Sequence, residues 1–428
     1  MEIGTFTLMK RSFFALLLVN LTCFAAGAQQ LWRNDNTNYK AIYFKEACDL
    51  IAKTPDLLLL DVRSPGEYAD TSQSIESRIG RLKGSVNVSI DSVERHYNEL
   101  LPYKGKTILV YCSHSFRSRK VSKFLADSGF TKVYSLNGGM TEVDREPDAA
   151  FPCKASLYTT SVPYKLMGPE DAAAFIRNKN NVVIDVRPAA QFNGTDTTEA
   201  KNIGRIKGAI NVPKANFDQS IPGLEKYKDK PILVYDLNVA DAMTAASKLK
   251  AAGFKNVAVL FDGFDTFLLN FPSSSNLRKE GVIAGPVYQL TGVREAVDLV
   301  NNAPGLVIAD MRPKDEFGNK SKGEFYNLGH IKNAINFTDG AQLEEYLKGK
   351  PKNTPVLIYG TFSAADAAQQ MNNMLDIDVA PICKKLAMEG YSNVHLLFNG
   401  LFWMVWASAN VDGQQDARSI LTDHEGLY

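Results

Sequence analysis

The sequence predicts an α/β protein of three tandem units, each a parallel sheet flanked by helices on both faces. The chain has 428 residues, enough for about three domains of roughly 100–200 residues each. Three aspartates at the ends of short apolar runs stand 124 and 125 residues apart: Asp61, Asp185 and Asp310. Within each unit, short apolar runs alternate with helical patterns. This alternation indicates parallel strands joined by helical crossovers.

Four segments recur in the same order in every unit. They are an apolar run ending in Asp-x-Arg, a glycine- and asparagine-containing segment, and two further short strands. They lie at 57–63, 80–88, 108–112 and 132–136, then at 182–187, 204–212, 232–236 and 256–260, and finally at 306–312, 329–337, 356–360 and 393–397. The intervals between them predict domains over 38–150, 164–272 and 286–410, followed by a C-terminal tail over 411–428.

Residues 1–28 are typical of a signal peptide. Lys10 and Arg11 provide a basic start, an apolar stretch follows over 13–24, and 26–28 read Ala-Gly-Ala, a small-residue cleavage site. The apolar stretch is short for a membrane span. We therefore expect an exported protein, in a bacterial periplasm, with no membrane span after cleavage. The alternative is an uncleaved anchor.

Composition argues against some classes of function but does not decide how the cysteines pair. The net charge is +1, which does not point to nucleic acid as a partner. Four cysteines follow the signal segment: Cys48, Cys112, Cys153 and Cys383. An exported protein can pair them, but no spacing identifies a bridge. There is no Cys-x-x-Cys, so we do not expect a structural zinc site. No further metal ligands are evident, and we expect no cofactor.

Cys112 occupies a distinctive position. Ile108–Tyr111 has the length and apolarity of a strand buried on both faces, and a helical pattern begins at Arg117. Cys112 thus lies at the carboxyl end of a parallel strand, where sites in such sheets are found. The N-terminus of the following helix favours a thiolate there. The alternative is a buried, inert cysteine, since most free cysteines are core residues.

Together these motifs resemble the rhodanese-like family. The resemblance rests on the Asp-Val-Arg at 61–63, the segment 80–88, the spacing Cys112-x4-Arg117-Ser118, and Asn-Gly-Gly-Met at 137–140. Rhodaneses are sulfurtransferases, so the resemblance implies that Cys112 takes a sulfane sulfur from a small donor as a persulfide. A thiol or cyanide acceptor would then remove it. The implied substrate-binding residues are Ser113, His114, Ser115, Phe116, Arg117 and Ser118.

The surrounding residues suit this chemistry. Backbone N–H groups of the loop can cradle an anionic persulfide, and the guanidinium of Arg117 can position an anionic donor such as thiosulfate or polysulfide. Asp61 and Arg63 are expected to support the loop from the adjacent strand end. Ser118 is a candidate helix cap.

Two loop residues depart from the usual pattern. Ser115 stands where many family members have glycine, so its side chain either narrows the mouth or strains the loop if the position needs a positive φ. His114 either tunes Cys112 or donates to the substrate, or it is an exposed residue with no role.

The second and third units lack the nucleophile. Asp236 and Gly360 replace the cysteine, and neither loop has the arginine. We expect these domains to be inactive and to hold a protein partner, to shape substrate access or to stabilise the chain.

Two alternative functions remain. One is a non-catalytic binding or scaffold protein. The other is a phosphatase-like or arsenate enzyme, which the four-residue loop between Cys112 and Arg117 disfavours because related phosphatases have five residues there.

Overall fold

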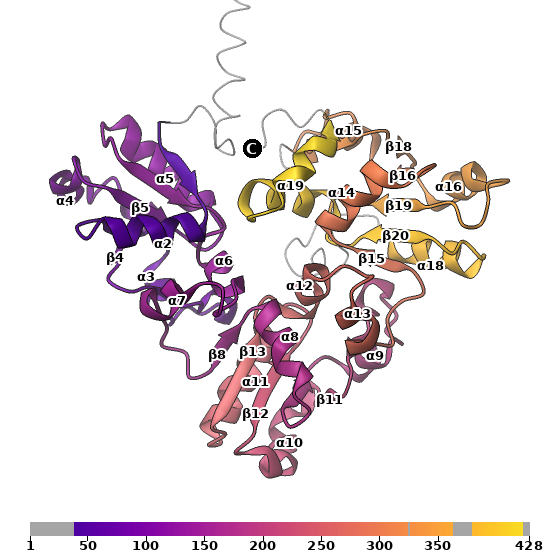
Figure 1. Ribbon diagram of the computed structural model, residues 1–428, viewed down its shortest axis with the longest axis horizontal. Coiled ribbons are helices and arrows are strands. Elements are labelled where there is room, and N and C mark those ends of the chain that lie inside the picture. The colour runs from indigo at the N-terminus through magenta and orange to yellow at the C-terminus, as the bar shows by residue number, and fades with distance from the viewer. Residues whose placement is uncertain (1–37, 324–325, 363–378, 423–428) are drawn as a thin grey trace, which may run out of the picture.

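The computed structural model describes residues 38–323, 326–362 and 379–422. The predicted signal segment 1–28 lies outside this range. Three five-stranded parallel sheets with flanking helices follow one another along the chain, as the sequence predicts. They form three domains arranged around a common centre (Figure 1).

The first domain holds Cys112. Its elements are β1 (Lys40–Ile42), α2 (Phe44–Lys53), β2 (Leu58–Asp61), α3 (Pro65–Tyr68), β3 (Arg81–Leu82), β4 (Val86–Asn87), α4 (Tyr97–Leu100), β5 (Ile108–Tyr111), α5 (Phe116–Asp127), β6 (Val133–Leu136) and α6 (Gly139–Arg145). The sheet order is β1-β6-β5-β2-β4, so β5, which carries the nucleophile candidate, is central. All four residues of β5 are buried.

The second domain repeats this plan. Its elements are β8 (Lys165–Met167), α8 (Pro169–Arg177), β9 (Val182–Asp185), α9 (Ala189–Asn193), β10 (Arg205–Ile206), β11 (Ile210–Asn211), α10 (Phe217–Leu224), β12 (Pro231–Tyr235), α11 (Ala240–Ala251), β13 (Asn256–Leu260) and α12 (Gly263–Asn270). Before it come α7 (Pro152–Leu157) and β7 (Tyr158–Thr159), and after it come α13 (Asn276–Gly281) and β14 (Val282–Ile283).

The third domain repeats the sheet once more. Its elements are β15 (Gln289–Thr291), α14 (Val293–Asn302), β16 (Val307–Asp310), α15 (Lys314–Phe317), β17 (His330–Ile331), β18 (Ile335–Asn336), α16 (Gly340–Leu347), β19 (Val356–Tyr359), α18 (Ala380–Met388), β20 (Val394–Leu397), α19 (Gly400–Asn410), η9 (Gln415–Ile420) and β21 (Leu421–Thr422).

The described part of the expected tail, 411–422, packs against the third domain. β21 pairs antiparallel with β17, just as β7 pairs with β3 and β14 with β10 in the preceding units. Each domain therefore receives a short strand from the segment that follows its sheet. The regularity was hidden in the sequence because a two-residue strand leaves almost no periodic signal.

The Asp-x-Arg motif has the same structure in all three domains. In the first, Arg63 donates through Nε and Nη2 to Asp61 and through Nη2 to the Gly80 carbonyl, at 2.7 Å. The same bonds join Arg187 to Asp185 and Arg312 to Asp310. The second and third domains have no cysteine equivalent to Cys112, yet they keep these bonds. The motif therefore has a structural role, in which the arginine joins the end of the strand to the carbonyl of a following glycine.

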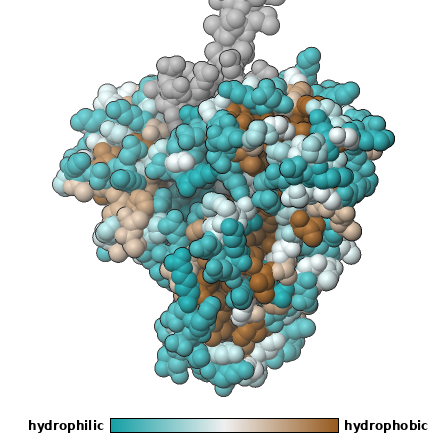
Figure 2. Space-filling model, turned by 45° about the vertical axis from the view of Figure 1, so that its right-hand side comes forward, coloured by the Kyte–Doolittle hydropathy of each residue, from teal (hydrophilic) through white to brown (hydrophobic). Residues whose placement is uncertain are grey.

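The domains share their apolar interior. Buried apolar side chains run without a break from the first domain into the second and, in another cluster, from the second into the third. On the face shown in Figure 2, most of the surface is hydrophilic and hydrophobic side chains are visible mainly through the middle and lower part.

Candidate functional site

Cys112 is the first residue beyond β5, on a strand held between β2 and β6. Cys112 is only 1 % exposed. Its carbonyl accepts from the Met140 N–H at 2.9 Å, so the N-terminus of α6 fixes the backbone of the cysteine. The strand-end position predicted from the sequence is confirmed.

The loop after Cys112 turns back on the sulfur. The Ser115 N–H points at Cys112 Sγ, with 3.2 Å between nitrogen and sulfur. The thiol in turn donates to Ser118 Oγ at 3.6 Å, and Ser118 Oγ donates to the Ser115 carbonyl. A backbone donor aimed at the sulfur from the start of α5 is an arrangement that stabilises an anion on that sulfur.

Ser115 does adopt the positive φ that glycine tolerates. Its φ is 101°, and its side chain does not narrow the mouth, because it is buried and Oγ accepts from the Gly138 N–H at 2.6 Å. The turn over 137–139 is also constrained. A Cβ on Gly139, whose φ is 58°, would lie 2.3 Å from the Cys112 carbonyl oxygen. The close approach requires glycine there.

Arg117 is held at the rim by a residue the sequence analysis missed. Both terminal nitrogens of Arg117 donate to Glu67 at 2.7 Å, and one also donates to Ser113 Oγ at 2.9 Å. Burial alone disfavours a charged Glu67, yet hydrogen bonds from Arg117 and Ser64 lower its pKa to about 2. The signal for Glu67 was its capping box with Ser64 at the start of α3.

A second arginine near the cysteine was also missed. Arg119 lies two residues after Arg117 in α5 and is 1 % exposed. It donates to Asn137 Oδ1 at 2.8 Å and to the Ala409 carbonyl in α19 at 3.2 Å. The third domain therefore contacts the Cys112 loop region, a relation between residues 290 apart that no local pattern shows.

His114 faces the third domain. Its ring centroid lies 6.3 Å from that of Trp406, edge to face. His114 is exposed to solvent, yet the protein packed around its ring desolvates the imidazolium and lowers the pKa of His114 to about 4. His114 is therefore neutral at pH 7. Phe116, at the start of α5, is 43 % exposed.

The sequence predicts that Asp61 and Arg63 support the Cys112 loop. Asp61 acts on the loop through its charge, which favours the charged form of Arg117. Asp61 raises the pKa of Arg117, after the larger effect of the Glu67 hydrogen bonds. The hydrogen bonds of Arg63 described above go to Asp61 and the Gly80 carbonyl.

All three domains meet at Arg145, the last residue of α6. It donates to Glu142 in the first domain at 2.5 Å and to Asp262 in the second. Its guanidinium carbon lies 5.1 Å from the Trp403 ring of the third. A cavity of about 130 Å³ opens beside this contact, lined by residues of all three domains but not by Cys112.

The equivalent loops of the other two domains carry no thiol. Asp236 is buried, and its Oδ2 accepts from the Asp241 N–H at 2.9 Å. Burial is the main cause that raises the pKa of Asp236 to about 7. In the third domain Gly360 is followed by Thr361, whose hydroxyl donates to Glu316.

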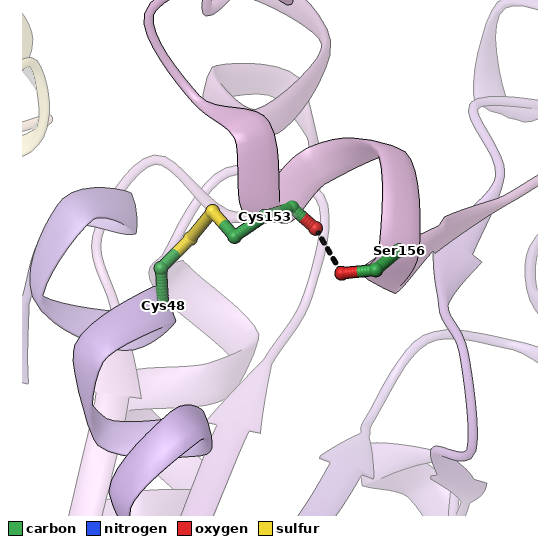
Figure 3. Close-up of a disulfide and its surroundings, with 3 residues drawn as sticks. All are labelled: Cys48, Cys153 and Ser156. Atoms are coloured by element: carbon green, nitrogen blue, oxygen red, sulfur yellow. Dashed lines mark hydrogen bonds between the residues drawn. A yellow bond between two sulfur atoms is a disulfide. The ribbon is translucent and has the colours of Figure 1, made fainter.

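A disulfide joins Cys48 in α2 to Cys153 in α7 (Figure 3). It fastens the segment after the first sheet onto the first domain. The pairing spans 105 residues, so only the folded chain reveals it. Cys112 remains a thiol.

Within the described ranges, no cluster of three or more histidine, cysteine or acidic side chains has the geometry to hold a metal ion. Over the same residues, no helix has the length and apolarity needed to cross a bilayer.

The fold and the cysteine loop define a class, and comparison with known proteins agrees. A family model described as a rhodanese-like domain matches residues 44–146, 168–270 and 293–406. The protein belongs to the rhodanese-like family, with three such domains in tandem.

Individual relatives match one domain at a time. The chain is 34% identical over 88 residues to a tRNA uridine(34) hydroxylase from Cytophaga hutchinsonii, which covers 20% of this chain and 25% of that protein. It is 33% identical over 101 residues to the thiosulfate sulfurtransferase GlpE from Coxiella burnetii, which covers 24% of this chain and 83% of that protein. The chain thus spans a quarter of the first relative and most of the second.

Solved structures match over a longer stretch. One is a thiosulfate sulfurtransferase from Pseudomonas aeruginosa, with 15% identity, a TM-score of 0.22, and coverage of 83% of this chain and 66% of that one. Another is an anaerobic ergothioneine biosynthesis enzyme from Chlorobium limicola, with 14% identity, a TM-score of 0.26, and coverage of 87% and 98%.

Proposed function

We propose that the protein is a sulfurtransferase that carries sulfur on Cys112. The observation that supports this most directly is the Ser115 N–H aimed at Cys112 Sγ from 3.2 Å. With thiosulfate as donor, the Cys112 thiolate attacks the sulfane sulfur. A new S–S bond forms, the bond to the sulfonate sulfur breaks, and sulfite leaves with the electron pair. A polysulfide would react in the same way and leave as a shorter polysulfide.

The second half-reaction regenerates the enzyme. Cyanide or a thiolate attacks the outer sulfur of the persulfide, and the Cys112 thiolate leaves. Both forms of Cys112 in this cycle are anions, so one set of donors serves both steps. Residues 113–118 provide that set, and Arg117 meets the anionic donor at the rim.

The four-residue loop favours sulfur over phosphate chemistry. The Ser115 N–H turns inward onto the sulfur itself, and Ser118 closes the other side at 3.6 Å. Such a small bowl suits one added sulfur atom better than a phosphoryl group with three equatorial oxygens.

The second and third domains have no thiol at the equivalent position, so we assign them no sulfur transfer. Their roles in this proposal are to brace the first domain and to offer surface for a protein partner.

Export to a bacterial periplasm is part of the proposal. The signal-like sequence over 1–28 supports it, and so does the Cys48–Cys153 disulfide, because disulfides persist in oxidising compartments. In such a compartment a reductant must keep Cys112 reduced between turnovers.

The test is an intact-mass spectrum of the purified protein after treatment with thiosulfate, polysulfide or a low-molecular-weight persulfide. We expect a gain of about 32 Da, the mass of one sulfur atom, on the wild type and none on Cys112→Ser, since the thiolate is the carrier. Turnover with cyanide or a thiol then identifies an enzyme. Persulfide formation without turnover supports a sulfur-binding scaffold, and no gain with any donor overturns the proposal.

A further inference from the structure

The last helix of the third domain ends against the Cys112 loop region. The Ala409 carbonyl accepts from Arg119 Nη2 at 3.2 Å. A Cβ on Gly138 would lie 3.1 Å from the Asn410 carbonyl oxygen, which shows how closely α19 approaches that turn. Ala409 belongs to the last turn of α19, where carbonyls lack intrahelical donors and the helix dipole is negative.

Arg119 needs such a partner because its charge is buried. Burial lowers the pKa of Arg119, whereas Tyr39, Tyr43 and Cys112 oppose that effect and Arg418 adds to it. A guanidinium does not give up its proton in a protein, so the charge must be compensated in place. The carbonyl at the end of α19 and Asn137 Oδ1 provide that compensation.

A short chain of hydrogen bonds leads from Arg119 to the sulfur. Arg119 holds Asn137, and the next residue, Gly138, donates its N–H to Ser115 Oγ at 2.6 Å. Ser115 in turn donates its N–H to Cys112 Sγ. The strained φ of 101° at Ser115 is therefore maintained by a turn that Arg119 anchors.

We propose that Arg119, which donates to the Ala409 carbonyl of the third domain, is a positioning residue for Cys112. A domain with no cysteine in its own equivalent loop thus prepares the thiol of the first domain for reaction. This inference rests on the proposed function for its biological meaning, but its test does not. Arg119 acts in two ways: it fixes the turn that holds Ser115, and its positive charge favours the anionic forms of Cys112.

The experiment measures alkylation of Cys112 by iodoacetamide in the full chain as a function of pH, by mass spectrometry. Arg119→Gln should slow alkylation at pH 7 about fivefold and move the midpoint of the pH–rate profile upward, since an opposite charge near a thiolate favours it. Arg119→Lys keeps the positive charge, so the midpoint of its pH–rate profile should lie closer to the wild-type pH than that of Arg119→Gln.

Arg278→Gln is the matched control. Arg278 is a partly buried guanidinium that also donates to carbonyls across a domain boundary, reaching Leu290 at 2.9 Å and Leu268 at 3.4 Å. Its loss should lower the melting temperature without moving the Cys112 profile. If Arg119→Gln also lowers only the melting temperature, Arg119 is merely structural and the proposal fails.

Hydrogen exchange tests the contribution of the third domain. In Arg119→Gln, amides of both the Cys112 loop and the end of α19 should exchange faster than in the wild type, and Arg278→Gln should leave both unchanged. Wild-type exchange at α19 would overturn the part assigned to the third domain. Iodoacetamide needs no sulfur donor, so these results stand or fall separately from sulfur transfer.

Discussion

Arg117 and Glu67 share two hydrogen bonds of 2.7 Å at the rim of the loop that holds Cys112. The forked geometry fixes the guanidinium plane, which a single contact would leave free to rotate. Glu67 also cancels the charge of Arg117 in part. The rim therefore presents oriented N–H donors to an anion more than it presents a bare positive charge.

Arg117→Lys should raise the KM for thiosulfate about tenfold with a smaller effect on kcat. An ammonium carries the charge but cannot form the fork with Glu67, so the rim loses its orientation. Steady-state kinetics with thiosulfate and cyanide provide the measurement. Ser113→Ala removes one hydrogen bond to the same guanidinium and should have a smaller effect. An unchanged KM in Arg117→Lys would contradict the assigned role.

The Glu67 carboxylate should stabilise the fold except in acid. Its pKa falls from the ordinary 4.5 to about 2, so the native state favours the charged form. The stabilisation, at most about 3 kcal/mol at 1.36 kcal/mol per pH unit, is present above pH 4.5 and is lost as the pH falls toward 2. Melting temperatures of wild type and Glu67→Gln should differ at pH 7 and converge near pH 2. A constant difference across that range would refute this account.

The fold was predictable because its signals are local and repeated three times. Each apolar strand ends in Asp-x-Arg, and the same Asp–Arg–carbonyl bonds form in every domain. The position of Cys112 at the end of β5 followed from the same pattern.

The rest of the site depends on contacts that join distant parts of the chain. Glu67 meets Arg117 across 50 residues, and Arg119 meets Ala409 across 290. The Cys48–Cys153 pairing is of the same kind. In each case local spacing specifies neither partner, because the packing of separate elements and domains brings the two together.

Ser115 offers a test of backbone strain against hydrogen bonding. Its φ of 101° costs about 1–3 kcal/mol in a residue other than glycine, while its hydroxyl satisfies the Gly138 N–H. Ser115→Gly relieves the strain but loses the bond, so we expect it within about 1 kcal/mol of the wild type. Ser115→Ala keeps the strain and loses the bond, and should cost about 2 kcal/mol. Urea unfolding followed by circular dichroism ranks the two, and an alanine variant as stable as the glycine variant would contradict the argument.

Asp236 should make the second domain less stable as the pH rises. Its pKa is raised from the ordinary 3.8 to about 7, so the native state retains a proton that the unfolded chain has released. Stability is therefore lost progressively between pH 4 and pH 7, by at most about 4 kcal/mol at 1.36 kcal/mol per pH unit. Asp236→Asn keeps an acceptor for the Asp241 N–H and removes the charge. The melting temperature of Asp236→Asn should match that of the wild type near pH 4 and exceed it at pH 8. Equal melting temperatures at pH 8 would show that the protein stabilises the charged carboxylate as well as water does, and would contradict this account.

The Cys48–Cys153 disulfide should stabilise the protein without entering the chemistry. Closing a loop of this length, with 105 residues of separation, lowers the entropy of the unfolded chain and stabilises the fold by about 4–5 kcal/mol. The double variant Cys48→Ser, Cys153→Ser should therefore melt well below the wild type, yet Cys112 should still take up one sulfur when the protein is folded. Dithiothreitol should lower the melting temperature of the wild type to that of the double variant and leave the double variant unchanged. If the double variant folds fully but no longer accepts sulfur on Cys112, the bond between α2 and α7 also determines the geometry of the loop.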